Sequence, residues 1–209
     1  MTHEERAWRD FLHQTPSHPE GDVEAWRRRY APFVDAVLRH RVVSSPKVCA
    51  VIIGWRSTRD LLESARCIRA QSGFSEDDLE ILLVNNGERE PSPSELEAHF
   101  DLEVKMKRNV SPSPGRNIAA AWTSAPYIAS LDDDGMIAPN YLETALRYFE
   151  DPLVAAVRTR IVARKHRYFT TLAEHYDRGD EVVADDLITE GSAILRRYVL
   201  LEVGVLRDS

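Results

Sequence analysis

Three consecutive aspartates, Asp132 to Asp134, follow a short apolar run and precede Gly135. Carboxylate oxygens are the ligands that Mg²⁺ and Mn²⁺ prefer, and such a cation often binds the phosphates of a substrate as well. The same residues could equally form a solvated acidic turn. Because successive side chains of a strand point to opposite faces, a turn starting at Asp133 is needed to bring Asp132 and Asp134 toward one site.

Two further clusters carry polar groups suited to a nucleotide. Asn85 and Asn86 each present amide donors and an acceptor that could read a nucleobase edge, although Asn-Gly is also a strong turn signal. Arg116 follows a Pro-Gly pair at the expected start of a helix. A helix N-terminus and a guanidinium both favour anions, but an ordinary helix start with a surface arginine is the alternative.

Alternating strand and helix patterns must position these clusters. Apolar runs predict strands over residues 47–55, 79–87, 102–108, 126–135 and 152–163, and amphipathic runs predict helices over 58–72, 92–100, 113–124 and 138–151. This alternation predicts an α/β sandwich around a mainly parallel sheet. Because ligands of open α/β sheets bind beyond the carboxyl ends of strands, the polar clusters are expected to share one edge.

Residues 1–46 differ from the rest of the chain. Helical patterns over 4–14 and 22–41 flank a breaker at 15–21, so we expect a helical extension before a main domain at 47–209. The extension either packs on the main domain or docks a partner protein or a second copy of the chain.

Composition narrows the functional classes. The 209-residue chain has a formal net charge of -7, which argues against a nucleic-acid binder held by general phosphate attraction. Its start is too charged for a signal peptide, and no apolar run approaches the roughly 20 residues that span a bilayer. Its two cysteines, Cys49 and Cys67, lie in an apolar run and a helical pattern, as expected for reduced thiols in a cytoplasmic protein.

Taken in order, four segments of the chain resemble the family 2 glycosyltransferases of GT-A fold. They are LEILLVNNG, NVSPSPGRNIAAAW, PYIASLDDDGMIAPNYLE and EGSAILRRYVLLEVGVLRD, and the resemblance covers roughly residues 47–208. It implies a three-layer α/β/α sandwich and a nucleotide-diphosphate sugar donor. The donor would be a UDP-, dTDP- or GDP-sugar, and the acceptor is not indicated.

The resemblance also implies roles for individual residues. Asp134 matches the second aspartate of the Asp-x-Asp motif and would hold Mn²⁺ or Mg²⁺ together with Asp132. Asn85 falls where the family often has an aspartate that reads uracil, and its carbonyl leaves uracil or thymine open. The residues expected to bind the nucleotide sugar are Gly54, Trp55, Arg56, Asn85, Asn86, Arg116, Asp132 and Asp133.

One departure from the family concerns the catalytic base. Inverting members carry an Asp or Glu that takes the acceptor proton, often in a Glu-Asp pair beyond the segment at which this sequence stops. Asp185, Asp186 and Glu190 are candidate substitutes, with surface or capping roles as the alternative for each.

Three functional hypotheses follow. The first is a metal-assisted, inverting glycosyltransferase, and the second is a donor-binding but catalytically incomplete partner of a complete transferase. A nucleotidyltransferase is the third, and it ranks last because no glycine-rich, lysine-bearing phosphate loop follows the first strand.

Overall fold

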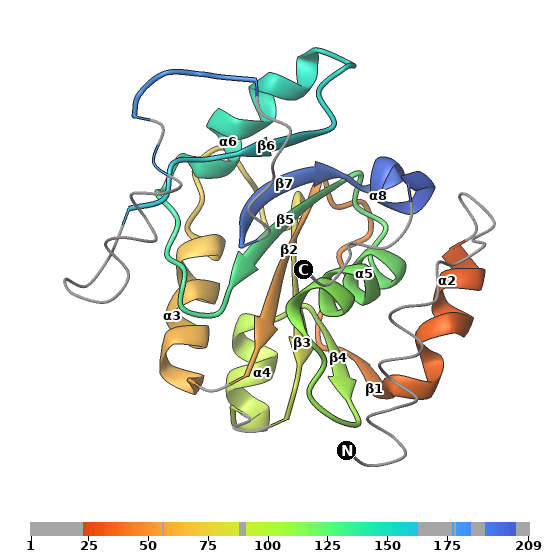
Figure 1. The fold of residues 1–209 in the computed structure, drawn as a ribbon. Coiled ribbons are helices and arrows are strands. Elements are labelled where there is room, and N and C mark those ends of the chain that lie inside the picture. The colour runs from red at the N-terminus through yellow and green to blue at the C-terminus, as the bar shows by residue number, and fades with distance from the viewer. Residues whose placement is uncertain are drawn as a thin grey trace.

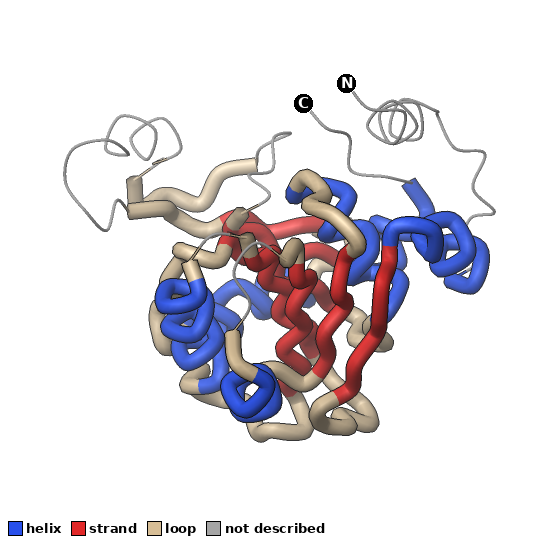
Figure 2. Tube along the Cα trace, turned by 90° about the horizontal axis from the view of Figure 1, so that it is seen from below, coloured by secondary structure: helices blue, strands red, loops and turns tan. Residues whose placement is uncertain are grey.

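A sheet of seven strands, in the order β1-β4-β3-β2-β5-β7-β6, forms the centre of the protein. The computed structural model describes residues 23–55, 57–87, 91–162, 177, 179–184 and 191–203. Figure 1 shows helices on both faces of the sheet, and Figure 2, turned by 90°, shows helices on either side of the strands. The predicted α/β/α sandwich is therefore confirmed.

The middle of the sheet is parallel. Its strands are β2 (Val48–Gly54), β3 (Leu79–Asn85), β4 (Leu102–Met106) and β5 (Tyr127–Asp132). Every residue of β2 and β3 is buried, as expected for parallel strands covered on both faces. The antiparallel strands β7 (Ser192–Arg196) and β6 (Ala156–Arg158) extend the sheet beyond β5, and β6 is much shorter than the strand predicted over 152–163.

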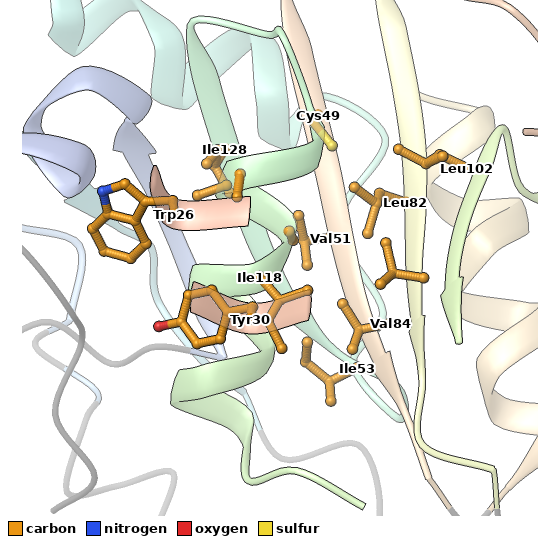
Figure 3. Packing of buried hydrophobic residues seen from close by; sticks show 14 of the residues in the cluster. Trp26, Tyr30, Cys49, Val51, Ile53, Leu82, Val84, Leu102, Ile118 and Ile128 are labelled. Atoms are coloured by element: carbon orange, nitrogen blue, oxygen red, sulfur yellow. The ribbon is translucent and has the colours of Figure 1, made fainter. Parts of the chain in front are cut away.

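Helices build a separate apolar core on each face. One face carries α5 (Pro112–Trp122), α2 (Val23–Tyr30) and α8 (Arg197–Val203). Figure 3 shows Tyr30 of α2 beside Ile118 of α5, with Trp26 of α2 in the same cluster. The other face carries α3 (Thr58–Arg69), α4 (Pro93–His99) and α6 (Tyr141–Leu146), which the 3₁₀ turn η2 (Arg147–Glu150) continues.

A close approach of α5 to β2 brings Arg116 near the sheet. A Cβ at Gly115 would lie 2.9 Å from Cδ1 of Ile53, which is too close for any larger residue without movement. Pro112 starts the helix, where its missing N–H costs nothing. The SPSPGR segment thus seats the first turn of α5 directly over the carboxyl end of β2.

The helix predicted over residues 22–41 is wrong in its second half. The helix ends at Tyr30, the 3₁₀ turn η1 (Ala31–Phe33) follows, and β1 (Val34–Arg39) pairs antiparallel with β4. Pro32 cannot continue a helical hydrogen-bond ladder, and the open edge of β4 offers strand pairing instead. The extension therefore contributes a strand to the main sheet.

Two other features complete the comparison with the sequence. The helix predicted over 4–14 lies outside the described residues, and the division of the chain at residue 46 stays a prediction. None of the helices that the structure describes is long and apolar enough to cross a membrane.

Candidate functional site

The polar clusters predicted from the sequence meet at one edge of the sheet. In the parallel register Gly54 of β2 lies opposite Asn85 of β3, and Ile53 lies opposite Asp132 of β5. Asn85 in turn lies opposite Lys105 of β4. The carboxyl ends of four neighbouring strands therefore carry Lys105, Asn85, Gly54 and Asp132 at one end of the sheet.

Arg116 lies beneath this edge and orients Asp132. Its Nη2 donates a hydrogen bond to Oδ1 of Asp132 at 2.8 Å, and its Nε donates to Oγ of Ser130. The Arg116 side chain is only 4% exposed, whereas that of Asp132 is 53% exposed. The arginine thus fixes one oxygen of the Asp132 carboxylate. Sequence reasoning missed Ser130, a polar residue in an apolar strand.

The expected turn at Asp133 is present. Residues 133 and 134 form a turn in which the Gly135 amide donates to the carbonyl of Asp132 at 3.1 Å. Oδ2 of Asp133 accepts from the backbone N–H of Trp55 at 3.1 Å, and Ser64 of α3 donates to the Gly135 carbonyl. Asp133 therefore ties the acidic turn to the end of β2, and Asp134 is left exposed.

Gly191 lets the chain pass directly against Asp132. A Cβ at this position would overlap the Asp132 carboxylate. The following strand, β7, is held nearby by Tyr141, whose hydroxyl donates to the Ser192 carbonyl at 3.2 Å. Burial raises the pKa of the Tyr141 phenol, so this donor stays protonated at alkaline pH as well. Sequence reasoning did not identify either residue.

Asn85 and Asn86 build the turn that ends β3. Nδ2 of Asn85 donates to Glu103, and its Oδ1 accepts from the backbone N–H of Gly87 at 3.0 Å. Oδ1 of Asn86 accepts from the backbone N–H of Val110 at 2.9 Å, and its Nδ2 donates to the Val110 carbonyl at 3.2 Å. Gly87 has a φ of +80°, which favours glycine. The turn alternative is therefore observed, and the role in nucleotide binding stays a prediction.

A basic depression adjoins this turn. Its volume is about 490 Å³, and it is lined by Asp35, Asn86, Gly87, Lys105, Met106, Lys107, Arg108 and Asn109. Lys107 donates to the Pro32 carbonyl at 3.0 Å, and Arg108 lies 5.7 Å from the ring centre of Phe33. The lining carries three cationic side chains and one carboxylate, that of Asp35, so this depression favours an anionic ligand group although the whole chain is negatively charged.

The acidic turn fits a cation that is shared with a substrate. Within the described ranges no three His, Cys, Asp or Glu side chains are arranged to hold a metal. Mg²⁺ usually needs only one or two carboxylates, with water and substrate phosphates completing its shell. Asp132 and Asp134 offer that number at an exposed edge.

Four of the predicted site residues cannot be placed. They lie outside the described residues, and they are Arg56, Asp185, Asp186 and Glu190.

Comparison with known proteins agrees with this architecture. Residues 50–200 match Glycosyl transferase family 2. The pre-mycofactocin glycosyltransferase of Mycobacterium tuberculosis is 34% identical over 88 residues, which are 41% of this chain and 19% of that protein.

Solved structures show the same fold. The mannosyltransferase PcManGT from Pyrobaculum calidifontis, in complex with GDP-Man and Mn²⁺, aligns with a TM-score of 0.59 and 21% identity over 88% of this chain and 52% of that one. TarS 1–349 of S. aureus, in complex with UDP, aligns with a TM-score of 0.56 and 14% identity over 74% and 48%. This chain thus spans about half the length of these structures.

These matches agree with the order of the motifs and with the sheet that carries them. The fold is GT-A-like, with a mixed sheet and a mainly parallel core. The chain belongs to glycosyl transferase family 2.

Proposed function

We propose that this chain binds a nucleotide-diphosphate sugar at the carboxyl edge of β2, β3 and β5 and transfers the sugar to an acceptor with inversion. The observation that supports this most strongly is the Asp132–Asp134 turn, held over the buried Arg116 in a family 2 fold. PcManGT was solved with GDP-Man and TarS with UDP, so both base types need testing.

Asp134 and Asp132 would hold Mn²⁺ or Mg²⁺, which would offset the negative charge that develops on the leaving diphosphate. Arg116 keeps the Asp132 carboxylate in one orientation, and Asp133 keeps the turn against the end of β2. Such fixed groups favour the transition state because they need no rearrangement during the reaction.

The remaining roles are nucleoside binding and removal of the acceptor proton. Gly54, Trp55 and Arg56 are proposed to line the nucleoside site. Asp185, Asp186 or Glu190 is proposed to take the proton from the acceptor hydroxyl as its oxygen attacks the anomeric carbon.

A panel of UDP-, dTDP- and GDP-sugars with Mn²⁺ tests the proposal by thermal unfolding and by release of the nucleoside diphosphate. A ligand at about 100 times its Kd adds about 2.7 kcal/mol to stability, so one donor should raise Tm by about 5–10 °C. No shift with any donor would contradict the proposal. A shift without donor hydrolysis or transfer would favour the second hypothesis, a donor-binding partner of a complete transferase.

A further inference from the structure

A buried carboxylate links the N-terminal strand β1 to the turn at the carboxyl end of β3, where the nucleotide sugar is proposed to bind. Glu103 of β4 is 1% exposed. Its Oε1 accepts from Nδ2 of Asn85 at 2.7 Å, and its Oε2 lies 3.3 Å from Nε2 of His40, the residue after β1. Oδ1 of Asn85 then accepts from the Gly87 N–H at 3.0 Å. The contacts therefore run without a break from His40 to the turn that lines the basic depression.

These contacts allow only one orientation of the Asn85 amide. With its NH₂ group toward Glu103, its oxygen faces the Gly87 N–H; the flipped amide would place donor against donor and oxygen against carboxylate. Because Asn85 is 4% exposed and Glu103 1%, water cannot replace either lost bond. The Asn86–Gly87 turn is therefore held by a carboxylate on the neighbouring strand.

The same contacts explain why residue 85 is an asparagine. An aspartate at this position would place a second carboxylate about 2.7 Å from that of Glu103, and two buried like charges at that distance cannot both ionise. His40 lies outside residues 50–200, the part that matches the family, so its contribution belongs to the N-terminal segment of this chain.

We propose that Glu103, held by His40, is a positioning residue for the nucleotide sugar: through Asn85 it fixes the Asn86–Gly87 wall of the donor site. The proposal rests on the proposed function. Glu103 would thus shape the Asn86–Gly87 wall through Asn85, without contacting the donor itself.

Glu80 offers a matched control. It is 2% exposed and contacts Arg39 of β1, 3.4 Å away, and Oγ1 of Thr123, 2.6 Å away. However, it lies near the start of β3, opposite Cys49 in the register, at the end of the strand away from Asn85. Glu80→Leu and Glu103→Leu therefore remove equally buried carboxylates from the same sheet, but only Glu103 supports the turn.

The first test compares donor binding in these two variants by titration calorimetry. Both should lower Tm, but Glu103→Leu should raise the Kd of the bound nucleotide sugar about tenfold while Glu80→Leu leaves it within about twofold. Equal weakening in both variants, or an unchanged Kd in Glu103→Leu, would overturn the inference. Wild-type protein that binds no donor would overturn the proposed function and this inference with it.

The second test needs no donor, because it follows hydrogen exchange of the Gly87 amide. At an alkaline pH at which the proton shared by the two carboxyl groups is lost, Asn85→Asp should speed that exchange about tenfold relative to wild type at the same pH, since the new carboxylate is then repelled by Glu103. Asn85→Asp combined with Glu103→Gln should restore the protection, because the glutamine amide can donate to the new carboxylate at position 85 while its oxygen faces His40. Gly87 exchange that stays at the wild-type rate in Asn85→Asp would show that the turn is held in another way.

Discussion

The Asp132 carboxylate lies between a guanidinium and a glycine. Arg116 holds one oxygen at 2.8 Å from below, and Gly191 leaves the space that the carboxylate occupies on the other side. The exposed carboxylate is therefore oriented by its neighbours as well as by its own strand. Such support from buried neighbours is what an electrostatic site requires if its charges are to stay in place when a ligand arrives.

Gly191→Ala should disturb Asp132 specifically. The backbone of Gly191 is not in the left-handed region, so the added methyl group acts only through its overlap with the carboxylate. We expect a cost of up to about 1 kcal/mol in the free energy of unfolding, because the half-exposed carboxylate can turn away from Arg116, and about tenfold weaker donor binding. Urea denaturation and calorimetry measure the two effects.

A double-mutant cycle provides the control for this prediction. In an Asp132→Ala background the methyl group meets no carboxylate, so Gly191→Ala should then cost less than about 0.5 kcal/mol. An equal cost in both backgrounds would show that the methyl group clashes with some other group.

Sequence reasoning reached part of this residue-scale picture. The Asp133 turn follows from the alternation of side chains in a strand, and the Asn-Gly pair indicates the turn after β3. The partners Glu103 and Gly191 lie far from Asn85 and Asp132 in the sequence, so only the register of the sheet brings each pair together. No local pattern encodes such contacts.

At the scale of elements, β1 is the part of the structure that departs most from expectation. Its hydrophobic residues recur at helical spacing, but β4 lacks a neighbour on one side without it. The segment also brings cations to buried carboxylates: Arg41 lies 2.6 Å from Asp101, which Arg69 of α3 also contacts at 2.9 Å. Pairing with a sheet edge and with buried charge therefore outweighs the helical periodicity.

Removing β1 should unfold the domain. A chain that starts at residue 47 exposes the β4 edge and leaves the buried Asp101, Glu103 and Glu80 without their partners from the N-terminal segment. A buried polar group that loses its partner costs about 1–3 kcal/mol. We expect it to be insoluble or unfolded by circular dichroism. A chain that starts at residue 23 keeps α2, η1 and β1 and should unfold cooperatively. A folded, soluble chain from residue 47 would place the domain boundary at residue 46, as the sequence pattern predicts.

At the scale of the whole molecule, the central sheet is covered on both faces. The order of buried strands and amphipathic helices predicted this arrangement, because strands buried on both faces appear as unbroken apolar runs such as KVCAVIIGW. The antiparallel direction of β7 and the pairing of β1 were not predictable in the same way, since strand order and direction outside the parallel centre depend on contacts across the fold. The mainly parallel centre followed from the sequence, whereas the order and direction of the outer strands did not.

Full burial of the Cys49 thiol makes the stability of the protein sensitive to alkaline pH. Burial, with the nearby charge of Glu80, raises the pKa of the Cys49 thiol well above its usual range. In the unfolded chain a thiol has a pKa of about 8.5, so above that pH the unfolded state alone gains from ionisation. Ionisation of Cys49 should leave the free energy of unfolding unchanged below about pH 8. Above that pH it should lower the free energy of unfolding by up to about 1.4 kcal/mol per pH unit.

Urea denaturation of wild type and Cys49→Ala between about pH 7 and 9.5 measures this dependence. The variant is expected to be less stable at neutral pH, because it leaves a small cavity, but to show a shallower decline above about pH 8.5. Identical slopes in the two proteins would contradict the assignment to Cys49.

The central claim is that Asp134 binds a cation together with a nucleotide-diphosphate sugar, and its most direct test is the Mn²⁺ dependence of donor affinity. Calorimetry should give a Kd for the donor at least about tenfold lower with Mn²⁺ than with EDTA in wild-type protein. Asp134→Asn, which keeps the size of the side chain and removes its charge, should abolish that difference without lowering Tm. Equal donor affinity with and without Mn²⁺ in wild-type protein, or a full Mn²⁺ effect in Asp134→Asn, would contradict the account.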